Sequence, residues 1–161
     1  MEIYILRHGD AELHDNAIAD KDRKLTGKGK RDVHAVLEAA RRAKAAPELI
    51  LTSPLRRAQE TAAIAATLFK SAKVMETRHL LPGASPAELW REIGSLRDVQ
   101  QVLLAGHQPQ LGHMVAFLLE AAAVADLKKS ALVRITTANR LGPPRGVLKW
   151  MITPRLVRRQ E

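Results

Sequence analysis

The chain has 161 residues, a length that suits one domain, and we expect a single domain over residues 1–161. It carries a net charge of +9 but only 3% aromatic residues, a composition that disfavours nucleic-acid binding because single-strand binders stack bases on aromatic side chains. The absence of cysteine excludes disulfides, thiolate catalysis and zinc–thiolate sites. The chain shows no signal-peptide pattern and no apolar stretch that would span a bilayer, so we expect a cytoplasmic protein with no membrane partner.

The first half of the chain alternates short β-like runs with helical patterns. Residues 2–6 are predicted to form a strand, and the polar residues 10–25 a loop. Thr26 is predicted to cap a helix that Pro47 terminates. Apolar residues recur inside that helix at helical spacing: Val33, Val36, Leu37, Ala40 and Ala43.

A second strand is expected over residues 48–52, followed by Ser53 as helix cap and Pro54 as first helical residue. That helix is predicted to reach about Phe69, and residues 73–76 to form a third strand.

The second half continues the alternation and then changes. Ser85-Pro86 predicts another helix start after the Pro82-Gly83 loop. Residues 101–105 are predicted to form a strand, and a turn over 106–109 to lead into a helix through about Ala122. Two closing strands are expected over 131–136 and 147–152, joined by a Gly/Pro-rich connection over 139–146. This order predicts an α/β fold with a mainly parallel sheet, whose last two strands pair antiparallel at one edge.

Charged residues follow three of these predicted strands. The first ends in Arg7-His8-Gly9, the second leads to Arg56-Arg57, and the fourth ends in Gly106-His107-Gln108-Pro109. Because the carboxyl ends of parallel strands meet at one edge of an open α/β sheet, we expect these groups to converge there.

The expected cluster suits phosphoryl chemistry. Arginine binds phosphate through a planar fork of donors, and a neutral histidine can attack phosphorus. A second, protonated histidine would stabilise the phosphoryl oxygens. Helix N-termini after Ser53 and Gln108 would add positive potential, and Gly9 would let the backbone approach an oxyanion.

Other charged stretches favour simpler interpretations. Thr26 to Lys30 resembles a phosphate loop, but Lys24 stands where that motif needs glycine. Asp20 and Asp22 are expected in a solvated loop rather than at a metal. Three further histidines show no partner pattern: His14, His34 and His113. Three arginines are expected in a solvated tail that is able to steer an anionic partner: Arg155, Arg158 and Arg159.

Four blocks of the chain resemble the histidine phosphatase (phosphoglycerate-mutase-like) superfamily, and together they are similar to its phosphohistidine phosphatase branch, the SixA type. These blocks are "DRKLTGKG" at 22–29, "LTSPLRRAQETA" at 51–62, "LLAGHQPQLG" at 103–112 and "LKWMITPRLV" at 148–157. The resemblance implies a three-layer α/β/α sandwich and no metal or other cofactor. It makes His8 the nucleophile that is transiently phosphorylated, with Arg7, Arg57 and His107 around the phosphoryl group. Arg57 is chosen over Arg56 because it directly precedes the alanine of the "RA" pair.

The resemblance leaves the general acid open. Larger relatives carry a carboxylate that protonates the leaving group, whereas here the candidates are His79, Asp10 and Glu76, and Gln108 stands where some phosphatases have an acid. A protonated imidazole leaves phosphorus more readily than an alkoxide does, so phosphohistidine needs such an acid less than an ester does. The short loops also leave little to build a lid over a small substrate.

These features predict a phosphohydrolase that removes phosphate from phosphohistidine on a protein and acts as a monomer. Around the catalytic four, the substrate-binding candidates are Gly9, Arg56, Gln108, His79 and Asp10. Two alternatives stay open: a phosphatase for a small phosphorylated metabolite or polyphosphate, and a phosphate-sensing or protein-interaction module without turnover.

Overall fold

The computed structural model describes residues 1–158 and contains one six-stranded sheet in the order β3-β2-β4-β1-β5-β6. The strands are β1 (Glu2–Arg7), β2 (Leu49–Thr52), β3 (Lys73–Glu76), β4 (Gln101–Gly106), β5 (Leu132–Thr137) and β6 (Gly146–Ile152). The first four pair in parallel, while β5 runs antiparallel to both β1 and β6. The mainly parallel sheet and the antiparallel hairpin at one edge are therefore confirmed.

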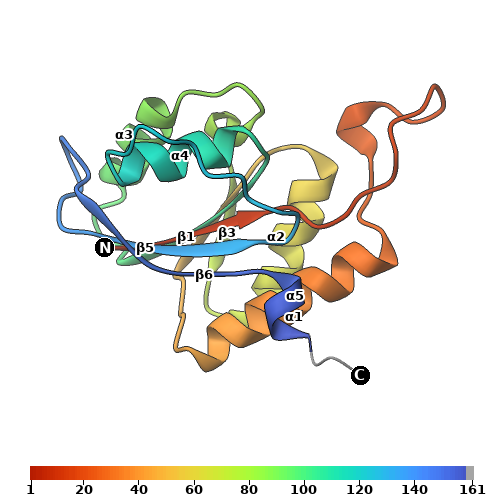
Figure 1. Ribbon diagram of the computed structural model, residues 1–161, viewed down its shortest axis with the longest axis horizontal. Coiled ribbons are helices and arrows are strands. Elements are labelled where there is room, and N and C mark those ends of the chain that lie inside the picture. Colours follow the sequence, from red (N-terminus) through yellow and green to blue (C-terminus); the bar gives the residue numbers. More distant parts are fainter. Residues whose placement is uncertain (159–161) are drawn as a thin grey trace.

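Helices cover both faces of the sheet, which gives three layers (Figure 1). The helices are α1 (Gly27–Arg42), α2 (Arg56–Leu68), α3 (Pro86–Ser95), α4 (Gln110–Leu118) and α5 (Pro154–Val157), with short 3-10 turns η1 (Asp20–Asp22) and η2 (Arg78–Leu80). Side chains alternate along β1, so Tyr4 and Leu6 pack with α1 and α2, and Ile3 and Ile5 pack with α3 and α4. The two apolar clusters, one on each side, confirm the three-layer sandwich.

Some helix boundaries follow the sequence signals and others do not. Thr26 caps α1, and its side chain accepts a hydrogen bond from the Gly29 amide at 3.0 Å. Pro86 is the first residue of α3, as predicted. By contrast, α4 ends at Leu118 rather than near Ala122, because Glu120 adopts a φ of 52°, which an α-helix does not continue through.

Two further expectations need correction. The cap at Ser53 is wrong: α2 begins at Arg56, with Leu55 at its N-cap. The hydroxyl of Ser53 accepts from the Leu55 amide at 3.3 Å and lies 2.8 Å from Nε2 of His107. The chain after β6 forms α5, which packs against α1, rather than a solvated tail. Arg159 lies outside the described residues.

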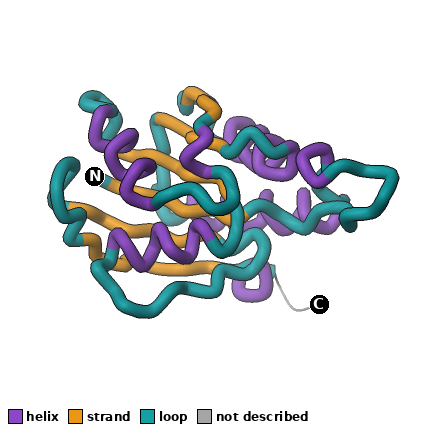
Figure 2. The backbone as a smooth tube through the Cα atoms, turned by 90° about the horizontal axis from the view of Figure 1, so that it is seen from above, coloured by secondary structure: helices purple, strands orange, loops and turns teal. Residues whose placement is uncertain are grey.

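The carboxyl ends of β1, β2 and β4 lie side by side, because β4 is hydrogen-bonded to both other strands. The connection from β1 to α1 projects beyond this edge of the molecule, in red and orange in Figure 1 and in teal in Figure 2. Its base is held by backbone hydrogen bonds, Thr26 to Asp10 and Glu12 to Lys24. Within residues 1–158, no helix has both the length and the apolar character needed to cross a bilayer.

Candidate active site

The register of the central strands brings His8 and His107 together. Arg7 pairs with Gly106 at the ends of β1 and β4, and the His8 amide donates to the Gly106 carbonyl at 3.0 Å. His8 directly follows Arg7, and His107 directly follows Gly106. The centroids of the two imidazole rings lie 5.1 Å apart. Both side chains are buried, with 7% of His8 and 2% of His107 exposed. Two histidines 99 positions apart in sequence thus share one small volume.

A hydrogen bond to the backbone fixes the proton of His8. Its Nδ1 atom lies 2.7 Å from the carbonyl oxygen of Gly9. Because a carbonyl oxygen only accepts, Nδ1 must carry the proton, and the Nε2 atom of the neutral ring holds a lone pair. Burial, and then the nearby Arg57 and Arg7, lower the pKa of His8 to about 4. His8 is therefore neutral at pH 7 and presents Nε2 as a nucleophile.

His107 is neutral in this structure too. Burial, and then His8 and Arg57, lower its pKa to about 3. Its Nε2 lies 2.8 Å from the hydroxyl of Ser53, while its Nδ1 is buried without a hydrogen-bond partner within residues 1–158. The sequence-based expectation of a protonated second histidine does not describe the unliganded site. Protonation of His107 would require an anion nearby to offset the cost of burying the charge.

Ser53 is a member of the site that the sequence did not reveal. It directly follows β2, and its amide donates to the Ala105 carbonyl at 3.0 Å, which places it beside His107. The Ser-Pro pair suggested a helix cap, and only the order of the strands brings the hydroxyl to the imidazole.

The two arginines come from different elements. Arg7 ends β1, is partly buried and donates from Nη1 to the Leu127 carbonyl at 2.7 Å. Arg57 lies in the first turn of α2 with 5% of its surface exposed. Its neighbour Arg56 points outward and pairs with Glu60 at 3.1 Å. The structure thus places Arg57 inside and Arg56 outside, in agreement with the preference taken from the "RA" pair.

A carboxylate already occupies the fork of Arg57. The Nη1 atom of Arg57 donates to the Asp20 backbone oxygen at 2.9 Å, and Nη2 lies 3.3 Å from Asp20 Oδ2. Arg23 holds the other carboxylate oxygen of Asp20 at 2.9 Å. The hydrogen bond from Arg23, followed by the nearby Arg57, keeps the pKa of Asp20 below its usual range. Asp20 and Arg23 belong to the predicted solvated loop, where no periodicity marked them.

Gly9 owes its identity to packing against α1. A Cβ atom at this position would lie 2.8 Å from the Gly29 backbone oxygen and 2.9 Å from a methyl carbon of Val33. The Gly9 amide donates to the hydroxyl of Thr61 on α2 at 3.3 Å, and that hydroxyl donates to the Arg57 carbonyl at 2.7 Å. The backbone at Gly9 therefore packs closely against α1 and α2, and these contacts hold the loop that carries His8 in place.

Two of the other substrate-binding candidates bind elsewhere. Gln108 donates to the Ala125 carbonyl at 2.6 Å and so anchors the chain after α4. His79 lies on η2, where its Nδ1 is 2.8 Å from Glu92 of α3, and its side chain is 41% exposed. Neither residue is hydrogen-bonded to His8, His107 or the two arginines in the described part of the chain.

The acidic candidates are also engaged outside the histidine pair. Asp10 accepts from Lys129 at 2.6 Å and from the Thr26 hydroxyl at 2.9 Å, and the hydrogen bond from Lys129 lowers its pKa. It is therefore ionised at neutral pH and has no proton to donate. Glu76, at the exposed end of β3, contacts Gln59.

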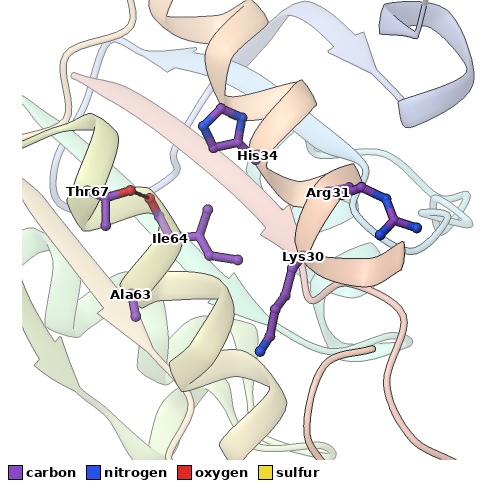
Figure 3. Close-up of a pocket in the computed structure, with 6 residues that line it drawn as sticks. All are labelled: Lys30, Arg31, His34, Ala63, Ile64 and Thr67. Atoms are coloured by element: carbon purple, nitrogen blue, oxygen red, sulfur yellow. Dashed lines mark hydrogen bonds between the residues drawn. The ribbon is translucent and has the colours of Figure 1, made fainter. Parts of the chain in front are cut away.

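The histidines and carboxylates that were considered as metal ligands do not form a metal site in the described part of the chain. Within residues 1–158, no three of the histidines and carboxylates converge in an arrangement that would hold a metal. His34 lies on α1 beside a groove that it shares with Ile64 and Thr67 of α2, as Figure 3 shows. The surface of that groove is mainly apolar, and neither His8 nor His107 lines it.

Comparison with known proteins decides the family of this site. Residues 3–82, which include Arg7, His8 and Arg57, match the family model "Histidine phosphatase superfamily (branch 1)". The chain belongs to the histidine phosphatase superfamily. Phosphohistidine phosphatase SixA of Escherichia coli strain K12 is 26% identical over 157 residues, which are 96% of this chain and 94% of SixA. A protein of Picosynechococcus sp. is 35% identical over 114 residues, 70% of this chain and 69% of its own length.

Solved structures of the superfamily share the fold. The structure of protein histidine phosphatase SixA complexed with tungstate has a TM-score of 0.89 and 24% identity, and the match covers 98% of this chain and all of that one. A mycobacterial glucosyl-3-phosphoglycerate phosphatase has a TM-score of 0.72 and 17% identity, over 92% of this chain and 97% of that one. The resemblance to the SixA type is confirmed across nearly the whole chain. The protein is therefore a phosphatase of the histidine phosphatase superfamily.

Proposed function

We propose that this phosphatase removes the phosphoryl group from phosphohistidine on a protein, without a metal. The observation that carries the proposal is that each candidate proton donor is hydrogen-bonded to residues outside the histidine pair. In residues 1–158, neither Asp10, Glu76 nor His79 is hydrogen-bonded to His8 or His107. A substrate whose leaving group needs no strong acid suits such a site best, and the imidazole of phosphohistidine is that kind of leaving group.

The proposed reaction has two displacement steps. The Nε2 lone pair of His8 attacks phosphorus in line, the P–N bond of the substrate breaks, and the substrate imidazole retains the bonding pair and a proton. Arg7 and Arg57 neutralise the phosphoryl oxygens, and Arg57 exchanges Asp20 for the phosphoryl group. Water then attacks the phosphorus on His8, the P–Nε2 bond breaks and its electron pair returns to Nε2, and inorganic phosphate leaves with the protons of the water.

The approach to the site also supports a protein substrate. The projecting connection between β1 and α1 extends outward from the edge of the sheet where the site lies, and the connections that follow β2 and β4 at this edge are short (Figures 1 and 2). A histidine displayed on the surface of a second protein is therefore the partner we propose. The absence of cysteine suits action in a reducing cytoplasm, and the proposed active form is a monomer.

Phosphate release from three substrates tests the proposal. Wild-type protein is incubated with a histidine-phosphotransfer domain phosphorylated by phosphoramidate, with p-nitrophenyl phosphate, and with tripolyphosphate. We expect release from phosphohistidine to exceed release from the ester and the polyphosphate at equal concentration, and His8→Ala to abolish it. Faster hydrolysis of the ester or polyphosphate would assign a small-molecule substrate instead. Binding of phosphate with no release from any substrate would assign a sensing module.

A further inference from the structure

A cleft of about 720 Å³ adjoins the active site on the side of Arg7. Four segments form it: the end of β1, the first turns of α1, the connection before β5, and residues 154–158. The connection before β5 is tied to the nucleophile, because the Ser130 amide donates to the His8 carbonyl at 3.2 Å. The lining residues, hereafter the basic cleft, are Arg7, Lys28, Asp32, Lys128, Lys129, Pro154, Arg155 and Arg158.

The basic cleft carries more positive charge than its own carboxylates balance. Six of its eight residues are cations, and Asp32 is the single acid among them. Asp32 is buried and binds both Lys28, at 2.8 Å, and Arg158. Asp126 pairs with Lys128 and Asp10 with Lys129, which still leaves three positive charges in excess among the described residues of the cleft and their partners. Self-repulsion of this kind costs stability, so an anionic partner would relieve it.

The cations are arranged for a broad anionic surface rather than for one phosphate group. Recognition of a single phosphate favours convergent arginine forks, whereas lysine is a hydrated point charge on a flexible stem. Three of the six cations are lysines, and Lys128 keeps 73% of its side chain exposed. Arg155 is also exposed, and no carboxylate within residues 1–158 pairs with it. Such rim charges attract an oppositely charged protein and orient it as it approaches.

We propose that the basic cleft docks an acidic protein surface that surrounds the phosphohistidine of the substrate. The inference rests on the proposed function and extends it, because it states the chemistry of the partner's face. Arg7 belongs to both sites: it lines the cleft and ends the strand that leads to His8. A partner held by Lys128 and Arg155 would therefore present its phosphohistidine beside the nucleophile.

The test compares a docking variant with a matched control. The docking variant is Lys128→Glu with Arg155→Glu. The control is Lys70→Glu with Arg91→Glu, which makes the same change in charge at exposed residues outside the cleft. Lys70 follows the C-terminus of α2, at the opposite end of the molecule from the site, and Arg91 lies on α3 across the sheet. Steady-state kinetics are measured with an acidic phosphorylated histidine-phosphotransfer domain and with phosphoramidate.

We expect the docking variant to lower the ratio of kcat/KM for the protein to kcat/KM for phosphoramidate by about tenfold or more, mainly through KM. The control should keep the wild-type ratio. The wild-type rate with the protein should fall steeply as salt is raised, and this salt dependence should weaken in the docking variant. Neutral substitutions, Lys128→Ala with Arg155→Ala, give an intermediate ratio and guard against misfolding of the charge-reversed protein.

Other outcomes separate the possible failures. If wild-type protein acts on phosphoramidate but not on the phosphorylated protein, the proposed function fails. If it acts on both and the docking variant keeps the wild-type ratio, the basic cleft has no docking role. If the docking variant keeps that ratio but loses binding of a single-stranded oligonucleotide, the cleft serves nucleic acid and the inference is overturned.

Discussion

The carboxylate of Asp20 lies 3.3 Å from Nη2 of Arg57, and the backbone oxygen of Asp20 accepts from Nη1 of the same guanidinium at 2.9 Å. A carboxylate, like a phosphoryl group, presents anionic oxygens that accept hydrogen bonds from arginine. In the proposed mechanism, Asp20 would therefore compete with the phosphoryl group for the fork of Arg57. Because Arg23 holds Asp20 from the other side, the competing anion is well placed in the unliganded protein.

Removing the charge of Asp20 should strengthen phosphate binding. For Asp20→Asn we expect the inhibition constant of inorganic phosphate to fall by roughly three- to tenfold, since the weaker competitor favours the incoming anion by about 1 kcal/mol. Asp22→Asn is the matched control, because Asp22 lies in the same 3-10 turn and forms no ion pair within residues 1–158. Weaker phosphate binding in Asp20→Asn would mean that Asp20 orients Arg57 instead of competing with phosphate.

The two adjacent arginines of α2 should differ sharply in their effect on turnover. Arg57→Ala removes a buried guanidinium next to the histidine pair, and we expect kcat/KM to fall by about 10²–10³-fold. Arg56→Ala removes an exposed pair with Glu60, and we expect less than about a twofold change. Steady-state kinetics on phosphoramidate measure both. Equal losses in the two variants would contradict the assignment of Arg57 as the phosphoryl ligand.

The hydroxyl of Ser53 should act through His107. Ser53→Ala leaves Nε2 of His107 without its partner at 2.8 Å, so the ring loses one constraint on its orientation. We expect kcat to fall by about tenfold, because small displacements of a catalytic group are costly. The ¹⁵N chemical shifts of the His107 ring should change as well, a signature that a purely structural loss would not produce. Ser85→Ala, at a helix cap without a side-chain hydrogen bond, should alter neither quantity.

Adding a methyl group at Gly9 should destabilise the fold as well as the site. A Cβ there meets a backbone oxygen of Gly29 at 2.8 Å, and backbone does not yield as a flexible side chain does. Overpacking of this kind typically costs about 1–3 kcal/mol, so Gly9→Ala should lower the free energy of unfolding in urea by that amount. Gly27→Ala is the control, because its nearest neighbour is the end of the Arg31 side chain at 3.4 Å. Equal stability of Gly9→Ala and wild type would show that the loop moves away freely.

Local sequence signals predict the strands and the pairing of His8 with His107. They do not predict contacts that depend on the order of the strands in the sheet. Arg7-His8-Gly9 and His107 each follow an apolar run, so their place at the sheet edge follows from the parallel alternation alone. The Ser-Pro pair predicts only a cap at Ser53, because the order β2-β4-β1 that brings Ser53 to His107 has no local signature.

Asp20 lies in a loop without periodicity, and α5 has only four residues, too few for a helical pattern to appear. Their contacts with Arg57 and α1 are long-range, and such contacts depend on how the whole chain packs.

The depressed pKa values of the two buried histidines should make the fold sensitive to mild acid. The pKa of His8 is lowered from 6.5 to about 4 and that of His107 from 6.5 to about 3, chiefly by burial. As the pH falls below 6.5, the unfolded chain binds protons at these residues while the folded protein does not. Proton binding therefore stabilises the unfolded state relative to the folded state. Stability is therefore fully present above pH 6.5 and declines as the pH falls toward about 4.

Replacing one of these histidines by a neutral residue should flatten that decline. For His107→Gln we expect the free energy of unfolding, measured by urea titration at pH 7.5, 6 and 5, to change less with pH than in wild type, because the unfolded chain has one fewer site to protonate in this range. His34→Gln, at an exposed position on α1, should retain the wild-type slope. The lowered pKa values of Asp10 and Asp20 act below the ordinary aspartate value of 3.8, outside this window. A wild-type slope in His107→Gln would mean that His107 takes up its proton in the folded protein near its ordinary pKa.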